Sequence, residues 1–380
     1  MNTKVSNIEE YFSIITDPRK SINKRHKLID IIVISICATL TGCETFTEIA
    51  EYGALKEEWL KEFLELPNGT PSHDTFTRVF RILDPEKFGK CFSEWVQALR
   101  EEISQEIVAI DGKTIRRSFD KAAEKSAFHL VSAFASENKL ALGQVCVKDK
   151  SNEITAIPKL LELLYLKGCI VTIDAMGCQK KIASAIRAKK ADYVLAVKGN
   201  QPTLEKEVKA ILDDEDFLGK CDYHKTENKK KNHGRFEVRE YYITEQISSL
   251  SDKEKWKDIK SVGMVKSSRT INGKTSLETR YFIASIKSDP KLFAKAVRKH
   301  WSIENSLHWV LDVVFNEDYS RSRKDCSAQN LGMLRKIALN LIRAEKSTKG
   351  SIRIKKLRAS IKDQYLMELL TNTKQGNSKT

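Results

Sequence analysis

The chain has 380 residues, and its 66 Lys and Arg exceed its 51 Asp and Glu to give a net charge of +15. A hydrophobic content of 41% and a charged content of 31% are typical of a globular protein and exclude a fibrous or mainly disordered one. The basic excess indicates acidic partners, of which nucleic acid is the most frequent. Eight scattered cysteines with no CxxC pair disfavour a structural zinc site or a disulfide framework.

Neither a targeting segment nor a membrane span is predicted. Residues 1–20 are polar and lack the apolar core of a signal peptide. The most apolar run, residues 31–40, has half the length of a membrane-spanning helix. We therefore expect a cytoplasmic, nucleoid-associated protein with no membrane partner.

The first hundred residues predict a helical domain, which we place at residues 1–103. Residues 28–40 and 73–83 have the apolar spacing of amphipathic or buried helices, and no strand pattern occurs in this region. The segment 73–83 also carries Arg78 and Arg81 beside an apolar stripe, as the recognition helix of a helix-turn-helix unit would. A surface helix packed on its neighbours has the same spacing, so both interpretations stand.

From residue 107 the pattern changes to short apolar segments rich in β-branched residues, which predict strands. The order of elements is three strands, then helix, strand, helix and strand. This is the order of an α/β protein with a ribonuclease-H-like fold. The predicted elements are strands 107–110, 128–135 and 140–147, helix 154–166, strand 169–173, helix 179–189 and strand 193–197.

A β-rich insertion is predicted at about residues 200–290. Within it, residues 224–235 are strongly charged and predict a solvated loop. Asn272-Gly273 predicts a tight hairpin turn. One long helix then follows from Pro290 to Val313.

The remaining domain boundaries follow from these elements. The α/β core and its insertion occupy residues 104–345. Residues 346–380 form a basic tail that contributes +7 to the net charge. Its polar end, residues 371–380, is predicted to be disordered.

Two aspartates end predicted strands and are followed by glycine-containing turns: Asp111 in IVAIDGKT and Asp174 in VTIDAMG. The carboxyl ends of parallel strands meet at one edge of a sheet, where functional groups gather. Carboxylates brought together there can hold two divalent ions for phosphodiester cleavage. For either aspartate alone, a turn-forming role explains the sequence equally well.

Glu304, on the predicted helix 290–313, can supply a third carboxylate, although taken alone it is explained as an exposed helix residue. Trp301 and Trp309 on the same helix are predicted to pack in the core or between domains. Neither a phosphate-binding glycine loop nor a dinucleotide fingerprint nor an HExxH motif is present, so nucleotide cofactors and zinc hydrolysis are not predicted. Four rival acids follow Glu304: Asp312, Glu317, Asp318 and Asp325.

Five motifs follow one another in the chain: IDGKTIRRS, VTIDAMGCQ, YVLAVKGNQP, HGRFEVRE and RKHWSIENSLHWVLDVVFNED. They resemble, in the same order, the H-repeat-associated insertion-sequence transposases of the DDE superfamily. The resemblance implies a ribonuclease-H-like core with the β-insertion before the last catalytic helix. It also implies that Asp111, Asp174 and Glu304 are the catalytic acids and bind two Mg²⁺ or Mn²⁺ ions. The implied reaction is cleavage of the element ends and joining of their 3′-hydroxyls to target DNA.

The surroundings of the glutamate depart from the pattern of related transposases, which carry a Tyr, an Arg and a Lys there. The corresponding positions here are Val297, His300 and Leu311, and Arg298 can replace the missing Arg. On a regular helix His300 shares the face of Glu304 and Arg298 does not. We therefore expect His300 to lie closer to the reacting phosphate and Arg298 to hold the flanking backbone.

The predicted partner is double-stranded DNA, both as element ends and as target, with a homodimer formed when two ends are synapsed. Two alternatives are a structure-selective nuclease on the same fold and a catalytically silent or repurposed DNA-binding protein. The candidate DNA contacts are basic residues near the acids in the sequence: Lys113, Arg116, Arg117, Arg298, His300, Arg321 and Arg323.

Overall fold

The computed structural model describes residues 6–20, 22, 24–119, 126–147, 153–214, 218, 221, 223–230 and 235–371. Its contacts divide the chain into two compact units, each assembled from separate stretches of sequence. The first unit comprises Met1–Glu102, Gly112–Asn152 and Glu304–Thr380, and the second comprises Ile103–Asp111 and Glu153–Ile303. The first unit therefore contains parts of all three predicted regions, 1–103, 104–345 and 346–380, whereas the second lies almost entirely within residues 104–345.

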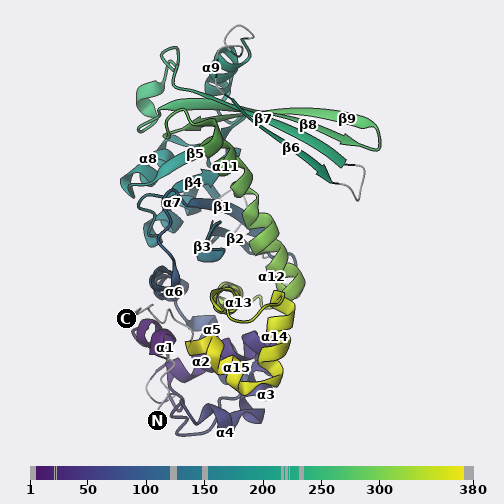
Figure 1. The fold of residues 1–380 in the computed structure, drawn as a ribbon. Helices are drawn as coiled ribbons and strands as arrows, with labels where there is room; N and C mark the ends of the chain where they lie inside the picture. The colour runs from purple at the N-terminus through teal and green to yellow at the C-terminus, as the bar shows by residue number, and fades with distance from the viewer. Residues whose placement is uncertain are drawn as a thin grey trace, which may run out of the picture. The chain divides into compact units, whose positions relative to one another are not determined.

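The helical region predicted for the first hundred residues is confirmed (Figure 1). Its α2 is apolar on nearly all sides and almost wholly buried, and it ends at Gly42, whose φ of 119° strongly favours glycine. Thr45 and Glu48 form a capping box at the start of α3. The helices are α1 (Ser6–Phe12), α2 (Leu28–Thr41), α3 (Phe46–Leu55), α4 (Glu57–Leu60), α5 (His73–Ile82) and α6 (Pro85–Leu99).

Helix α13 (Ser327–Ala344) is the core of the first unit. It is buried along most of its length and packs on α2, α5 and α6 and on strand β3 (Leu140–Val147). β3 forms the predicted antiparallel hairpin with β2 (His129–Ala135). The N-terminal helices therefore share one core with α13.

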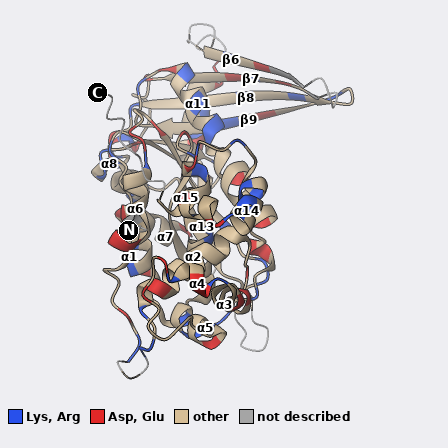
Figure 2. Cartoon of the chain, turned by 60° about the horizontal axis from the view of Figure 1, so that its bottom comes forward, with Lys and Arg blue, Asp and Glu red and all other residues tan. Residues whose placement is uncertain are grey.

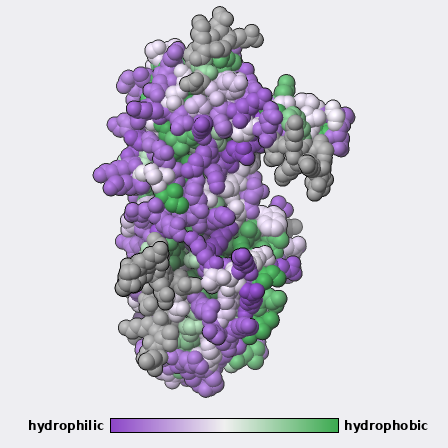
Figure 3. All heavy atoms as spheres, viewed as in Figure 1, coloured by the Kyte–Doolittle hydropathy of each residue, from purple (hydrophilic) through white to green (hydrophobic). Residues whose placement is uncertain are grey.

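The region predicted as a basic tail contains two packed helices, α14 (Ile352–Ile361) and α15 (Asp363–Thr371). α14 packs on α2 and carries four Lys and Arg residues, shown in blue in Figure 2. It also exposes three apolar side chains, and hydrophobic residues gather over it in Figure 3. These are Ile354, Leu357 and Ile361. The predicted disorder of 371–380 falls, beyond Thr371, outside the described residues.

The second unit is built on a mixed sheet with the strand order β1-β4-β5-β9-β8-β7-β6. Strands β1 (Ile107–Thr114), β4 (Ile170–Ile173) and β5 (Asp192–Val197) are parallel. Helix α7 (Glu153–Leu163) precedes β4, and helix α8 (Lys180–Ala188) connects β4 to β5, in the predicted order. The last residues of β1 belong to the first unit.

The predicted β-rich insertion continues this sheet rather than forming a separate one, because β9 pairs with β5. The prediction of a solvated loop at 224–235 is wrong for its first part: residues 223–230 form β6, which pairs along its full length with β7. Residues 231–234 lie outside the described ranges. The strands of the insertion, preceded by helix α9 (Pro202–Leu212), are β6 (Tyr223–Lys230), β7 (Arg235–Thr244), β8 (Ser261–Ile271) and β9 (Lys274–Ala284).

The single helix predicted from Pro290 to Val313 is interrupted. Helix α11 (Pro290–His300) ends at Trp301, and a π turn η5 (Glu304–His308) then leads into α12 (Trp309–Val314). α11 packs on β4 and β7, with the Phe293 ring against Phe282. A Cβ at Gly263 would lie 2.6 Å from that ring, so a glycine is required in β8 for this close approach.

Within the described ranges, no single helix is both long enough and apolar enough to cross a membrane. The consecutive helices α2 and α3 meet the length and composition criteria only together, across a 97° bend.

Candidate active site

Asp111 and Asp174 directly follow the last paired residues of the neighbouring parallel strands β1 and β4, which are Ile110 and Ile173. Asp174 comes after the end of β4, whereas Asp111 lies within β1, which continues to Thr114 and is longer than the predicted strand 107–110. Neighbouring strands are about 4.8 Å apart, so this register brings the two carboxylates to one edge of the sheet. Asp111 is half-buried and Asp174 is exposed.

Asp174 also shapes the turn that follows it. Its Oδ1 accepts hydrogen bonds from the backbone N–H groups of Met176 (3.1 Å) and Gly177 (3.4 Å), at the start of the short 3₁₀ helix η3 (Ala175–Gly177). The turn-forming role weighed in the sequence is therefore present. Both of these bonds use one oxygen of the carboxylate, so the turn does not exclude a ligand role.

The loop after β5 braces this turn, a role that the sequence motif YVLAVKGNQP did not suggest. The Asn200 side-chain amide donates to the carbonyl of Ala175, next to Asp174. Gln201 Nε2 donates to the carbonyl of Cys178 at 3.1 Å and to Gln179 Oε1 at 3.3 Å. The sequence signal for this role was a polar Asn-Gln pair in the loop that follows a buried strand. The same pair is equally typical of an ordinary turn.

Gly177 provides a test of this turn. A Cβ at this position would lie 2.2 Å from Ile173 Cγ2, so Gly177→Ala must displace either the Ile173 side chain or the turn that holds Asp174. We expect a lower melting temperature, from a cost of about 1–3 kcal/mol in unfolding free energy, and a larger loss of DNA cleavage than stability alone explains. Gly199→Ala is the matched control, because no atom lies within 4 Å of its added Cβ. Equal activity of the two variants would show that the turn is not needed.

His300 is tied to the strand that carries Asp174. Its Nδ1 is hydrogen-bonded to Thr172 Oγ1 at 3.1 Å. Burial lowers the pKa of His300 below its usual value, and the nearby Asp174 carboxylate opposes this shift. Arg298, two residues earlier on α11, is exposed.

Glu304 is exposed and begins the π turn η5. π turns inside helices occur frequently at functional sites. The interruption at Trp301 and the wider π turn break the regular 3.6-residue spacing, so the shared helix face expected for His300 and Glu304 does not follow from their numbering. Trp301 (39% exposed) and Trp309 (58% exposed) are not core residues, so the first of the two predicted alternatives is wrong.

The rival acids are already engaged by cations. Lys113 Nζ pairs with Asp312 and, at 2.9 Å, with Glu317 Oε2, and Asp318 lies 3.6 Å away. Asp325 Oδ2 accepts hydrogen bonds from both Nε (2.8 Å) and Nη2 (2.7 Å) of Arg81. The Lys113 ammonium has three carboxylate neighbours and its side chain is only 12% exposed, so it is a poor phosphate contact.

Lys113 and three of these acids belong to a buried ionic cluster of the first unit, which we call the Lys113 cluster: Lys113, Asp312, Glu317, Asp318, Arg335 and Lys336. Burial alone would raise the pKa of Glu317, but Lys336, Lys113 and Arg335 lower it to about 2. Burial lowers the pKa of Lys336 to about 8, against the opposing influence of Glu317. The cluster fixes the end of β1 to the segment that follows α12.

The other predicted DNA contacts of the first unit occupy one region. Arg117 lies over the Tyr319 ring, 4.6 Å from its centre, and Arg323 Nε donates to the Arg117 carbonyl at 3.3 Å. Arg116 is mostly exposed and lies 3.3 Å from Asp318 Oδ2. Arg321 is exposed as well. These four arginines remain available to an anionic ligand.

The aspartate pair suits a hard divalent cation. Mg²⁺ prefers oxygen ligands, retains several waters and is usually held by one or two carboxylates, which Asp111 and Asp174 can provide. Among the described residues, no group of three or more His, Cys, Asp or Glu side chains is arranged as a complete metal site. The pair therefore fits a metal that is completed by water or by substrate oxygens.

Comparison with known proteins places the chain in a family. The transposase DDE domain matches residues 102–341, and the DDE_Tnp_1-associated family matches residues 9–96. "Putative transposase YncI" of Escherichia coli O157:H7 is 44% identical over 97% of this chain and 95% of its own length. "H repeat-associated putative transposase YhhI" of Escherichia coli K12 is 38% identical over 97% of this chain and 99% of its own length.

A solved synaptic complex of piggyBac transposase with hairpin DNA aligns with 98% of this chain and 78% of that chain, at 10% sequence identity and a TM-score of 0.45. A score of this size does not establish a shared fold. The family matches rest on sequence alone, and they agree with the motif resemblance over nearly the whole chain. This chain is a member of the DDE transposase family.

Proposed function

We propose that the protein is the transposase of an insertion sequence, which cleaves DNA at the element ends and joins the freed 3′-hydroxyls to target DNA. The pairing of Ile110 with Ile173, which sets Asp111 beside Asp174, supports this proposal most directly. The order of strands and helices supports a ribonuclease-H-like core. Asp111, Asp174 and Glu304 would hold two Mg²⁺ or Mn²⁺ ions, which when bound stabilise charge on the phosphate and activate water.

The chain's own groups have separate tasks in this proposal. The N–H groups of Met176 and Gly177 hold the Asp174 carboxylate in one orientation. His300, fixed by Thr172, donates to the reacting phosphate. The solvent-accessible arginines hold the flanking DNA backbone, and they are Arg116, Arg117, Arg298, Arg321 and Arg323. Two copies of the chain would pair when both element ends are bound.

To test the proposal, the purified protein is incubated with a plasmid that carries its gene and the natural flanking sequence, and the DNA products are analysed. A transposase gives element 3′ ends joined to target DNA when Mg²⁺ or Mn²⁺ is added. A structure-selective nuclease gives cut ends without joined products, and a silent DNA-binding protein gives neither. Either of the last two results would reject the proposed strand transfer.

The roles of His300 and Arg298 can be separated by kinetics. His300→Ala is expected to lower the cleavage rate by roughly 10²-fold with little loss of DNA affinity, since it removes one positioned donor. Arg298→Ala is expected to weaken binding and to reduce the salt slope of log K by about 0.9, the value for one phosphate contact. If Arg298→Ala changes the rate alone while His300→Ala changes nothing, the two roles are reversed.

A further inference from the structure

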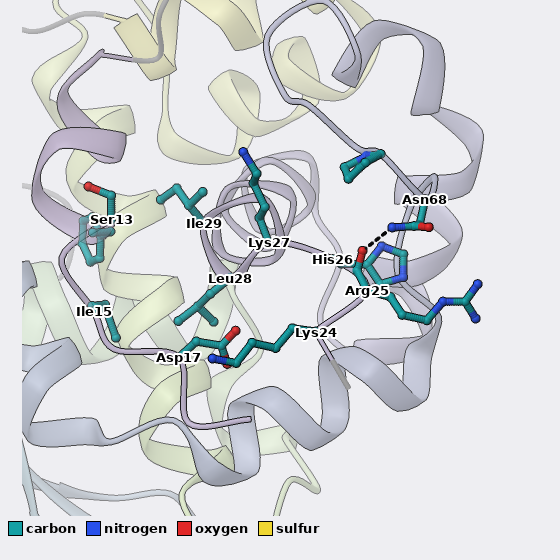
Figure 4. A pocket seen from close by; sticks show the side chains of 12 residues that line it. Ser13, Ile15, Asp17, Lys24, Arg25, His26, Lys27, Leu28, Ile29 and Asn68 are labelled. Atoms are coloured by element: carbon teal, nitrogen blue, oxygen red, sulfur yellow. Dashed lines mark hydrogen bonds between the residues drawn. The ribbon is translucent and has the colours of Figure 1, made fainter. Parts of the chain in front are cut away.

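A pocket in the first unit lies where the chain enters α2. Its volume is about 510 Å³, the size of a small-molecule site. Its apolar floor is formed by Phe12, Ile15 and Leu28, all of which are buried. Four consecutive basic residues, Lys24-Arg25-His26-Lys27, form one wall, and Figure 4 shows Lys24 extending toward Asp17 while Arg25 points outward.

The basic wall is held in place by three hydrogen bonds to its backbone or ring. Asn68 Nδ2 donates to the Arg25 carbonyl at 2.6 Å, as Figure 4 shows. Arg19 Nη2 donates to the His26 carbonyl at 2.6 Å, and His26 Nδ1 donates to the Gly69 carbonyl at 3.2 Å. A charged loop that is merely solvated does not need such support, whereas a preorganised loop binds its ligand at a lower entropic cost.

The charges of this pocket do not cancel. Its acid, Asp17, is bound by Arg19 through two side-chain hydrogen bonds, and Lys27 pairs with Glu65. Lys24 and Arg25 are exposed, and neither has a salt-bridge partner in the described part of the chain. The wall therefore presents two positive charges that a bound anion could neutralise.

The start of α2 also favours an anion here. Lys27, the first residue before α2, provides no side-chain cap, so the N–H groups of the first turn of this 14-residue helix carry the positive end of its dipole.

Helix α5, the other candidate for DNA contact among the N-terminal helices, has most of its polar groups occupied by contacts within the protein. Arg81 is neutralised by Asp325, and His73 lies 3.4 Å from Asp74. At its C-terminal end the Phe80 and Leu83 carbonyls accept hydrogen bonds from Asn330 of α13. These contacts are those of a surface helix packed on its neighbours, and they leave Arg78 as its main cation toward solvent.

We propose that the pocket at the start of α2 binds the phosphodiester backbone of DNA, with Lys24 and Arg25 as its phosphate contacts. The N-terminal helices then meet DNA through this pocket and not through α5. The proposal rests on the proposed function, which supplies DNA as the anionic partner. Because the two side chains point in different directions, they would contact different phosphates.

The test measures how salt weakens binding of the full-length protein to a short labelled DNA duplex, by fluorescence anisotropy. Loss of two phosphate contacts in Lys24→Gln/Arg25→Gln is expected to reduce the slope of log K against log salt by about 1.8. Lys87→Gln/Lys90→Gln on α6 is the matched control, because it removes the same charge from exposed positions of the same unit and should leave the slope unchanged. Arg78→Gln on α5 should also leave it unchanged.

An unchanged slope in Lys24→Gln/Arg25→Gln, or an equal drop in Lys87→Gln/Lys90→Gln, would overturn the proposal. Thermal melting of each variant identifies any loss of fold. The plasmid assay on the unmodified protein is independent of this result. Absence of cleavage together with the expected slope change would reject the enzyme and keep the DNA-binding pocket, whereas normal cleavage with an unchanged slope would reject only the pocket.

Discussion

Asp111→Asn, Asp174→Asn and Glu304→Gln are each expected to abolish DNA cleavage in Mg²⁺ or Mn²⁺ while leaving DNA binding nearly intact. Each change keeps the shape of the side chain and removes the charge that a divalent ion requires. A metal contributes several kcal/mol to transition-state stabilisation, so the cleavage rate should fall roughly a thousandfold or more. In Asp174→Asn the side-chain amide oxygen can still accept the hydrogen bonds that cap η3. A loss of cleavage in this variant therefore reports the loss of a metal ligand and not the loss of the turn.

The control for this series is Asp312→Asn, which changes a neighbouring acid that already pairs with Lys113. Its cleavage rate, corrected for the folded fraction, should stay close to that of the unmodified protein. Normal cleavage by Glu304→Gln together with a dead, well-folded Asp312→Asn would show that the third acid has been assigned to the wrong residue.

Lys113→Met is expected to cost about 3–5 kcal/mol in unfolding free energy, because it leaves the fully buried Glu317 without one of its partners. Chemical unfolding at neutral pH measures this value. Arg81→Met breaks the exposed pair with Asp325 and should cost less than about 1 kcal/mol. If the two losses were equal, Lys113 would not be part of a buried ionic cluster in solution.

The pH dependence of the unfolding free energy tests the Lys113 cluster through its buried acid, Glu317. The pKa of Glu317 is lowered to about 2 from its ordinary value of 4.5. Its carboxylate therefore stabilises the fold above about pH 4.5, and this contribution is lost as the pH falls toward 2. Lys113→Met should raise the pKa of Glu317, and so shift the acid-induced loss of stability to a higher pH than in the unmodified protein.

The aspartate pair was predictable from the sequence because each aspartate follows a β-branched run, and parallel strands end at a common edge. The pairing of Ile110 with Ile173 realises that expectation. The place of Lys113 was not predictable, since a net charge of +15 does not show which cations pair with which acids. Its partners Asp312 and Glu317 are about two hundred residues away in the chain.

Local geometry explains two further differences. The periodicity of residues 290–313 contains no proline or glycine after Pro290 to mark a break, so the π turn at Glu304 could not be seen in it. Residues 223–230 are polar enough for a solvated loop, and they form β6 because β7 offers a complete row of backbone partners. Asn200 and Gln201 show a similar limit, because their roles depend on the distant turn after Asp174.

The pairing of β5 with β9 determines when the sheet can be completed during synthesis. Strands β6, β7 and β8 each pair with the strand that follows them in the chain, so this meander forms from short-range contacts. Val194 in β5 instead pairs with Ala284 in β9, 90 residues later, and closing so long a loop is entropically costly and slow. Until β9 has been synthesised, the edge of β5 stays open to pairing with other chains. Copies of the gene truncated before residue 274 should therefore yield a protein that aggregates through that edge.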